Sequence, residues 1–215
     1  MTRKLTKKLL PLVFFLTYLL FPFNVLAQQE PAHVLFINQV RGSECCAKGS
    51  LENLKTQIEV FIKNNIPAFF ALRYDALNDE KYIAYLKEIH QKRPDIIQLG
   101  LLIEITPQLA GDAKVKYQGS DYKWFEGQNA FTIGYTPEER KKIIDFLFVK
   151  FFQIFGSYPK FTSAWMLDTE SLNYMHTHYK TIVHQITREQ WGVDSYTLYG
   201  GPPHYPYPAS KNWAF

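Results

Sequence analysis

Ionisable side chains follow each of five apolar runs that predict buried strands. They are Arg41 and Glu44, Arg73 and Asp75, Glu104, Asp168 and Glu170, and Arg188 and Glu189. Two carboxylates supplied by different strands can hydrolyse a glycosidic bond, either as acid and base or as acid and nucleophile. Glu104 interrupts an apolar run, and a buried carboxylate is costly unless it is paired or protonated. We therefore consider Glu104, together with Asp168 or Glu189, as the candidate catalytic residues.

Two of these carboxylates also have structural interpretations. Glu104 is equally well explained by a buried ion pair with Arg73 or Arg41, because structural ion pairs perturb carboxylates as readily as active sites do. Asp168 precedes a short predicted helix, and Asp is among the best N-cap residues. The sequence leaves both alternatives open.

Other polar and aromatic residues are candidates for holding a substrate. The candidates are Arg41, Arg73 and Asp75 at predicted strand ends, and Trp124, Trp191 and His204 in predicted loops. Aromatic rings offer flat apolar faces with polar edges, which suit sugar rings. The alternative for the loop aromatics is that they pack the long loops against the core.

Apolar runs alternate with helical stripes along the chain. The predicted strands are His33–Asn38, Pro67–Leu72, Ile96–Ile105, Phe161–Leu167 and Thr181–Thr187. The predicted helices are Ser50–Asn65, Asn78–Lys92, Thr136–Phe155 and Ser171–Tyr179, and a long loop is expected at Thr106–Tyr135. Strands separated by helices imply a parallel sheet with right-handed crossovers. We therefore predict an α/β fold with a parallel sheet.

The number of strands bears on whether the sheet closes. Five βα units are visible, whereas a closed eight-stranded barrel usually needs about 250 residues, and the chain has 215. The alternatives are an open sheet, or a parallel (β/α) barrel whose remaining strands lie beyond residue 215. We favour the incomplete barrel, and we expect ligands at the carboxyl ends of the strands.

The first residues predict a secretory signal peptide at residues 1–27, followed by one domain at residues 28–215. A basic start, an apolar stretch from Leu9 to Phe23 and small residues before a cut after Ala27 are typical of such a leader. The alternative is a retained membrane anchor. Either way, we expect the domain outside the cytoplasm, secreted or at the cell envelope.

Charge and motifs exclude several functional classes. The formal net charge of +4 comes from 24 basic and 20 acidic residues, and the four basic residues of the leader account for the excess. A nucleic-acid partner is therefore disfavoured. No dinucleotide, P-loop or serine-hydrolase motif is present. We expect no cofactor and no metal site. Cys45 and Cys46 are read as loop thiols, with a redox pair or half a metal site as the alternatives.

Two short motifs and the layout resemble one family. Ile66–Phe70 is similar to the second-strand motif of polysaccharide deacetylases, and Phe155–Lys160, leading into Ala164–Met166, is similar to the approach to their later strand. The resemblance covers about Val34–Gly192. It implies the seven-stranded (β/α) barrel of the glycoside hydrolase/deacetylase superfamily, which acts on carbohydrate.

The metal-ligand positions of that family differ here. Phe36–Val40 stands where those deacetylases carry T-F-D-D-G, and Ile103–Thr106 stands where they carry H-x-x-x-H. We therefore expect a hydrolase-like protein that acts on carbohydrate or cell-wall polysaccharide, rather than a metal-dependent deacetylase. The alternative is a non-catalytic carbohydrate-binding domain on an inherited barrel.

Overall fold

The computed structural model describes residues 34–42, 50–121, 123 and 126–186. The chain divides into two compact units, Met1–Val34 and Leu35–Phe215, and all the elements below belong to the second. The predicted leader, the two cysteines and four candidate site residues lie outside the described residues; the four are Trp124, Glu189, Trp191 and His204.

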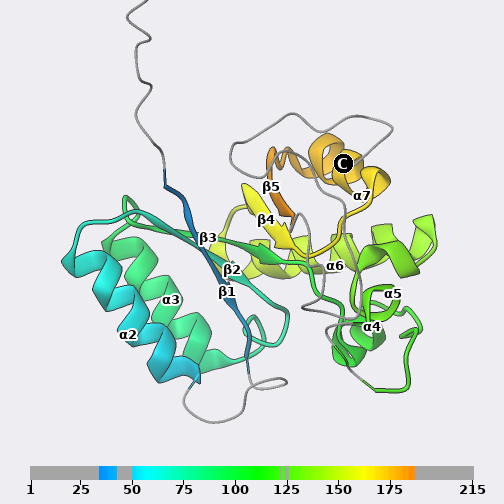
Figure 1. Cartoon of the computed structure of the whole chain (residues 1–215), viewed down its shortest axis with the longest axis horizontal. Helices are drawn as coiled ribbons and strands as arrows, with labels where there is room; N and C mark the ends of the chain where they lie inside the picture. Colours follow the sequence, from blue (N-terminus) through cyan, green and yellow to red (C-terminus); the bar gives the residue numbers. More distant parts are fainter. Residues whose placement is uncertain (1–33, 43–49, 122, 124–125, 187–215) are drawn as a thin grey trace, which may run out of the picture. The chain divides into compact units, whose positions relative to one another are not determined.

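Five parallel strands form a single sheet (Figure 1). They are β1 (Phe36–Val40), β2 (Ala68–Leu72), β3 (Ile97–Leu102), β4 (Phe161–Ala164) and β5 (Val183–Ile186). The strands lie side by side in the order in which they occur along the chain. Right-handed crossovers between strands in sequential order put every helix on the same face, which is the winding of a barrel. The predicted parallel α/β fold is confirmed, as a curled half-barrel.

Four long helices cover the outer face of this sheet. They are α2 (Ser50–Lys63), α3 (Glu80–Lys92), α6 (Pro137–Phe155) and α7 (Thr169–Tyr179). All four contribute to one buried apolar core with alternate strand residues such as Phe70 and Leu101. The predicted helix Thr136–Phe155 is confirmed as α6, and its start is a capping box of Thr136 and Glu139. In the part of the chain that the structure describes, no helix combines the length and apolar character needed to cross a membrane.

The other set of alternate strand residues points into the curl. Ala71, Leu102 and Phe161 form a separate buried cluster there. Gln39 on β1 donates its amide N–H to Ser163 Oγ on β4 at 3.3 Å, although β2 and β3 lie between these strands in the sheet. A side chain can span that separation only because the sheet bends strongly. The side chains of β1 and β4 that point into the curl therefore touch each other across the inner face.

The segment predicted as one long loop, Thr106–Tyr135, contains ordered helical turns. They are α4 (Pro107–Asp112), α5 (Gly127–Ala130) and the 3-10 turn η1 (Thr132–Gly134). The Thr106 hydroxyl accepts a hydrogen bond from the Leu109 N–H at 3.2 Å, and Pro107 occupies the first helical position, which is favourable for starting a helix. The expectation of a plain loop was wrong here, because these elements are too short for a periodic apolar stripe.

The same segment lies against the ends of two strands. The Ile105 N–H, just beyond β3, donates to the Ala130 carbonyl oxygen at 2.7 Å. Ala130 and Phe131 pack with Met166, just beyond β4, in a small buried cluster. Because the chain beyond these strands bonds to and packs against this segment rather than a neighbouring strand, β3 ends at Leu102 and β4 at Ala164. Both ends lie three residues before the predicted ones.

Gly100 provides a test of how tightly the inner face is packed. A Cβ atom added there would lie 2.5 Å from the Phe161 carbonyl oxygen and 2.6 Å from its ring. We expect Gly100→Ala to lower the free energy of unfolding by about 1–3 kcal/mol through overpacking. Gly111→Ala is the control, because a Cβ at that helical position meets no atom within 4 Å. Denaturant unfolding measures both, and equal stabilities would contradict the packing described above.

Candidate functional site

Four charged side chains meet where β1, β2 and β3 end. Arg41 directly follows β1, Arg73 and Asp75 follow β2, and Glu104 follows β3. Arg41, Arg73 and Glu104 each continue the alternation of residues that point into the curl. Since parallel strands end at the same edge of the sheet, these residues converge there. We call Arg41, Arg73, Asp75 and Glu104 the strand-end cluster.

Hydrogen bonds join the cluster into one chain of alternating charges. Arg73 donates from Nε and Nη2 to the two carboxylate oxygens of Asp75, both at 2.8 Å. Its Nη1 donates to Glu104 Oε1 at 2.5 Å. Arg41 donates from Nη2 to Glu104 Oε2 at 2.6 Å, and from Nε to Oε1 at 3.1 Å. Both Glu104 oxygens are therefore engaged by guanidinium groups.

Burial makes this pairing essential. The side chains of Arg73 and Glu104 are 0% exposed and that of Asp75 is 3% exposed, whereas that of Arg41 is 21% exposed. Two guanidinium charges oppose two carboxylate charges, so the cluster is formally neutral when all four groups are ionised. Two adjacent positive charges favour the carboxylate form of Glu104. The ion-pair interpretation of Glu104 is thus confirmed, with both arginines taking part.

Asp168 belongs to a different network. It caps α7, where its Oδ1 accepts from the Ser171 N–H at 2.8 Å and its Oδ2 accepts from the Ser171 hydroxyl at 2.7 Å. Arg140 pairs with Asp168 Oδ1 at 2.9 Å. Burial acts to raise the pKa of this carboxyl, but the neighbouring Thr132 hydroxyl, the hydrogen bonds from Ser171 and the charge of Arg140 outweigh it and hold the pKa below its usual value.

The structure does not join Asp168 to Glu104 through any shared hydrogen-bond partner among the described residues. Asp168 is an N-cap, as the structural interpretation predicted. Its role as a catalytic partner of Glu104 stays a prediction, as does that of Glu189. Of the predicted substrate-binding residues, Arg41, Arg73 and Asp75 lie together in the strand-end cluster.

Two side chains near the strand ends, Tyr117 and Trp165, were not among the sequence-based candidates. Burial and the charge of Glu126, with a smaller contribution from the charge of Glu104, raise the pKa of the Tyr117 phenol to about 12. Trp165, which follows β4, donates its indole N–H to Gln39 Oε1 at 3.4 Å. Tyr117 and Glu126 lie far from any predicted strand end, so their sequence positions gave no signal of this proximity.

Arg140 is a further residue that the sequence did not single out. Its Nε donates to the Tyr135 carbonyl oxygen at 2.7 Å, and its Nη1 pairs with Asp168. One side chain of α6 therefore connects the segment that covers the strand ends with the first turn of α7.

Comparisons with known proteins leave the site to be interpreted from its own geometry. No protein-family profile, curated protein or solved structure matches the chain significantly. Within the described residues, no group of three or more His, Cys, Asp or Glu side chains is arranged to hold a metal ion.

The first prediction from this site concerns the stability of the cluster. We expect Glu104→Gln to lower the free energy of unfolding by about 3–5 kcal/mol, because it leaves the buried Arg73 and the partly exposed Arg41 with a single carboxylate. Glu88→Gln is the matched control, since Glu88 pairs with Lys92 on an exposed helix face and such pairs contribute little. Equal effects in denaturant unfolding would show that the cluster is not needed for folding.

The second prediction concerns the acid dependence of the α7 cap. Asp168→Asn keeps an N-cap side chain but removes the charge, and we expect it to cost about 1 kcal/mol at neutral pH. Because the pKa of Asp168 is lower in the folded state, its charge stabilises above the unfolded-state pKa near 4. The difference between the wild type and Asp168→Asn should shrink as the pH falls below that value. A difference that stays constant down to acid pH would contradict the pairing with Arg140.

Proposed function

We propose that the protein is a carbohydrate-active protein that binds and processes a glycan at the strand-end cluster. The observation that supports this proposal is the convergence of Arg41, Arg73, Asp75 and Glu104 at the carboxyl ends of three neighbouring strands. Parallel barrels form their active sites at this edge of the sheet. The resemblance to the glycoside hydrolase/deacetylase superfamily, which the half-barrel architecture is compatible with, points to carbohydrate as the substrate class.

The state of Glu104 limits the chemistry that it can perform. A carboxylate flanked by two guanidinium groups is a poor proton donor, so Glu104 suits the role of base or nucleophile rather than acid. As a base it would activate a water molecule, and as a nucleophile it would attack the anomeric carbon. Asp168 does not suit the acid role either, because its hydrogen bonds and Arg140 hold its pKa low. Glu189 is the remaining candidate for the general acid.

A second candidate function is carbohydrate binding without catalysis. It is favoured by a specific observation: both oxygens of Glu104 already accept hydrogen bonds from arginines, and both oxygens of Asp168 are used in capping α7. On this alternative, the strand-end cluster is a rigid polar surface under the ligand, and Arg41 is the member that contacts it. We also propose that the protein acts outside the cytoplasm on cell-wall or secreted polysaccharide, as the predicted leader indicates.

Arg41→Gln tests the proposal without breaking the buried Arg73–Glu104 pair. The wild type is screened on a glycan array, and the bound glycan is then used in titrations and in assays for released reducing ends and acetate. We expect Arg41→Gln to weaken binding about tenfold, as for the loss of one charged hydrogen bond. Arg93→Gln is the control, because Arg93 pairs with Asp95 on the surface.

The outcomes separate the two candidate functions. A hydrolase would lose about a hundredfold or more of its turnover in Glu104→Gln that is still folded by circular dichroism. Binding with no product supports the non-catalytic alternative. If no glycan binds, or if Arg41→Gln binds like Arg93→Gln, the strand-end cluster is not a carbohydrate site.

A further inference from the structure

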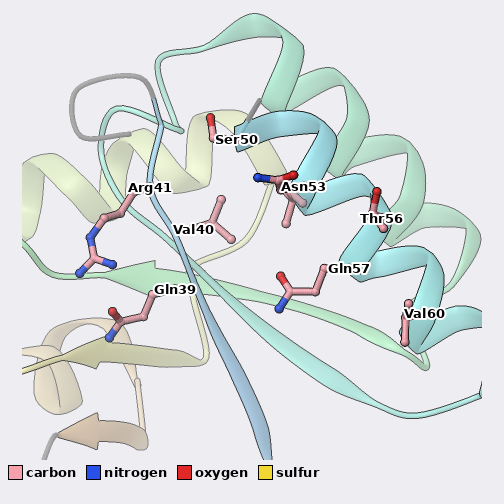
Figure 2. A pocket seen from close by; sticks show the side chains of 9 residues that line it. Gln39, Val40, Arg41, Ser50, Asn53, Thr56, Gln57 and Val60 are labelled. Atoms are coloured by element: carbon pink, nitrogen blue, oxygen red, sulfur yellow. The ribbon is translucent and has the colours of Figure 1, made fainter. Parts of the chain in front are cut away.

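A groove runs between β1, the edge strand of the sheet, and the helix α2. It has a volume of about 570 Å³, which lies within the range of small-molecule sites. Its described lining consists of Gln39, Val40, Arg41, Ser50, Asn53, Leu54, Thr56, Gln57 and Val60. Figure 2 shows Asn53 and Gln57 extending from α2 toward β1, and Gln39 and Arg41 extending from the other side of β1. We call this feature the β1–α2 groove.

The polar side chains of the groove are mostly amides and hydroxyls. Asn53, Gln57 and Val60 follow one another at helical spacing, so one exposed stripe of α2 faces the groove. Gln57 donates to Asn38 Oδ1 on β1 at 2.6 Å, which fixes the separation between helix and strand. Amide and hydroxyl groups both donate and accept hydrogen bonds. They therefore match the hydroxyl groups of a sugar better than they match an ionic ligand.

Charge also favours an uncharged ligand. Arg41 is the one charged residue of the described lining, and its guanidinium pairs with Glu104 at 2.6 Å. The strand-end cluster as a whole is formally neutral. The groove thus has no unbalanced charge, among these residues, that would select an anion or a cation.

The groove and the strand-end cluster have one residue in common. Arg41 lines the groove and also binds Glu104 in the strand-end cluster. Gln39 lines the groove and also accepts from the Trp165 indole at the end of β4. The Arg41 guanidinium lies on the other side of β1 from α2 (Figure 2), so a ligand that extends from the strand-end cluster into the groove must pass β1.

We propose that the β1–α2 groove is a subsite for a neutral segment of polysaccharide that extends from the strand-end cluster. This proposal rests on the proposed function, and it adds that the substrate is an extended, uncharged glycan chain. The competing occupant is a polypeptide strand that pairs with β1 at the edge of the described sheet. Main-chain hydrogen bonds would hold such a strand, so it would not depend on the amide groups of Asn53 and Gln57.

Oligosaccharides of different length test the subsite. The probes are short and long members of the chito-, cello- and xylo-oligosaccharide series, titrated calorimetrically against the full chain. We expect the wild type to bind the long member of the preferred series more tightly than the short one. The ratio of the two dissociation constants should fall about tenfold in the double variant Asn53→Ala/Gln57→Ala, which removes two uncharged hydrogen-bonding groups.

Gln91→Ala is the matched control for this experiment. Gln91 is an exposed amide on α3 that does not line the groove, so its removal should keep the full length dependence. NMR titration adds a second readout: the long oligosaccharide should shift the side-chain amide signals of Asn53 and Gln57 in the wild type.

Each outcome decides between the proposals. Wild-type binding that does not depend on length, or a length dependence that the double variant retains, overturns the subsite while leaving the strand-end proposal standing. Saturation with the long oligosaccharide without a shift of the Asn53 and Gln57 amides also overturns it. Absence of binding to every oligosaccharide, with none on the glycan array, overturns the proposed function and the subsite together.

Discussion

The neutralisation of Arg73 is the interaction on which the strand ends depend. A guanidinium with no exposed surface is tolerated only if its charge is opposed and its donors are used. Asp75 meets this need from the same strand end, and Glu104 meets it from the end of β3. Arg41 then balances the second carboxylate from β1. One buried cation thereby fixes the relative positions of three strand ends.

The curl of the sheet makes its inner face concave, and the ion pairs of the strand-end cluster lie at one end of that face. Gln39 reaches Ser163 across the hollow, while Gly100 leaves space for the ring of Phe161. Below the charged layer, the inner face is filled by a small apolar cluster; at the charged layer, it is closed by ion pairs. The outer face is occupied by helices, so the proposed ligand would approach from the strand ends or along the edge of β1.

Sequence reasoning predicted the order of the elements because long apolar stripes and caps are local signals. The predicted helix Thr136–Phe155 corresponds to α6, and Glu104 was identified as a carboxylate that could be paired with a buried arginine. It did not find α5 or η1, which are too short to show periodicity and are ordered by contacts with the ends of β3 and β4. Nor did it find the β1–α2 groove, because the distance between an edge strand and a helix is set by tertiary packing.

The bridge made by Arg140 has a consequence for how the region opens. The same guanidinium binds the Tyr135 carbonyl on the covering segment and the Asp168 cap of α7. Displacing that segment from the strand ends breaks a bond that also supports the helix start, and unwinding the helix start removes a support of the segment. The two parts therefore form one cooperative unit of local unfolding, whose backbone amides exchange with solvent together.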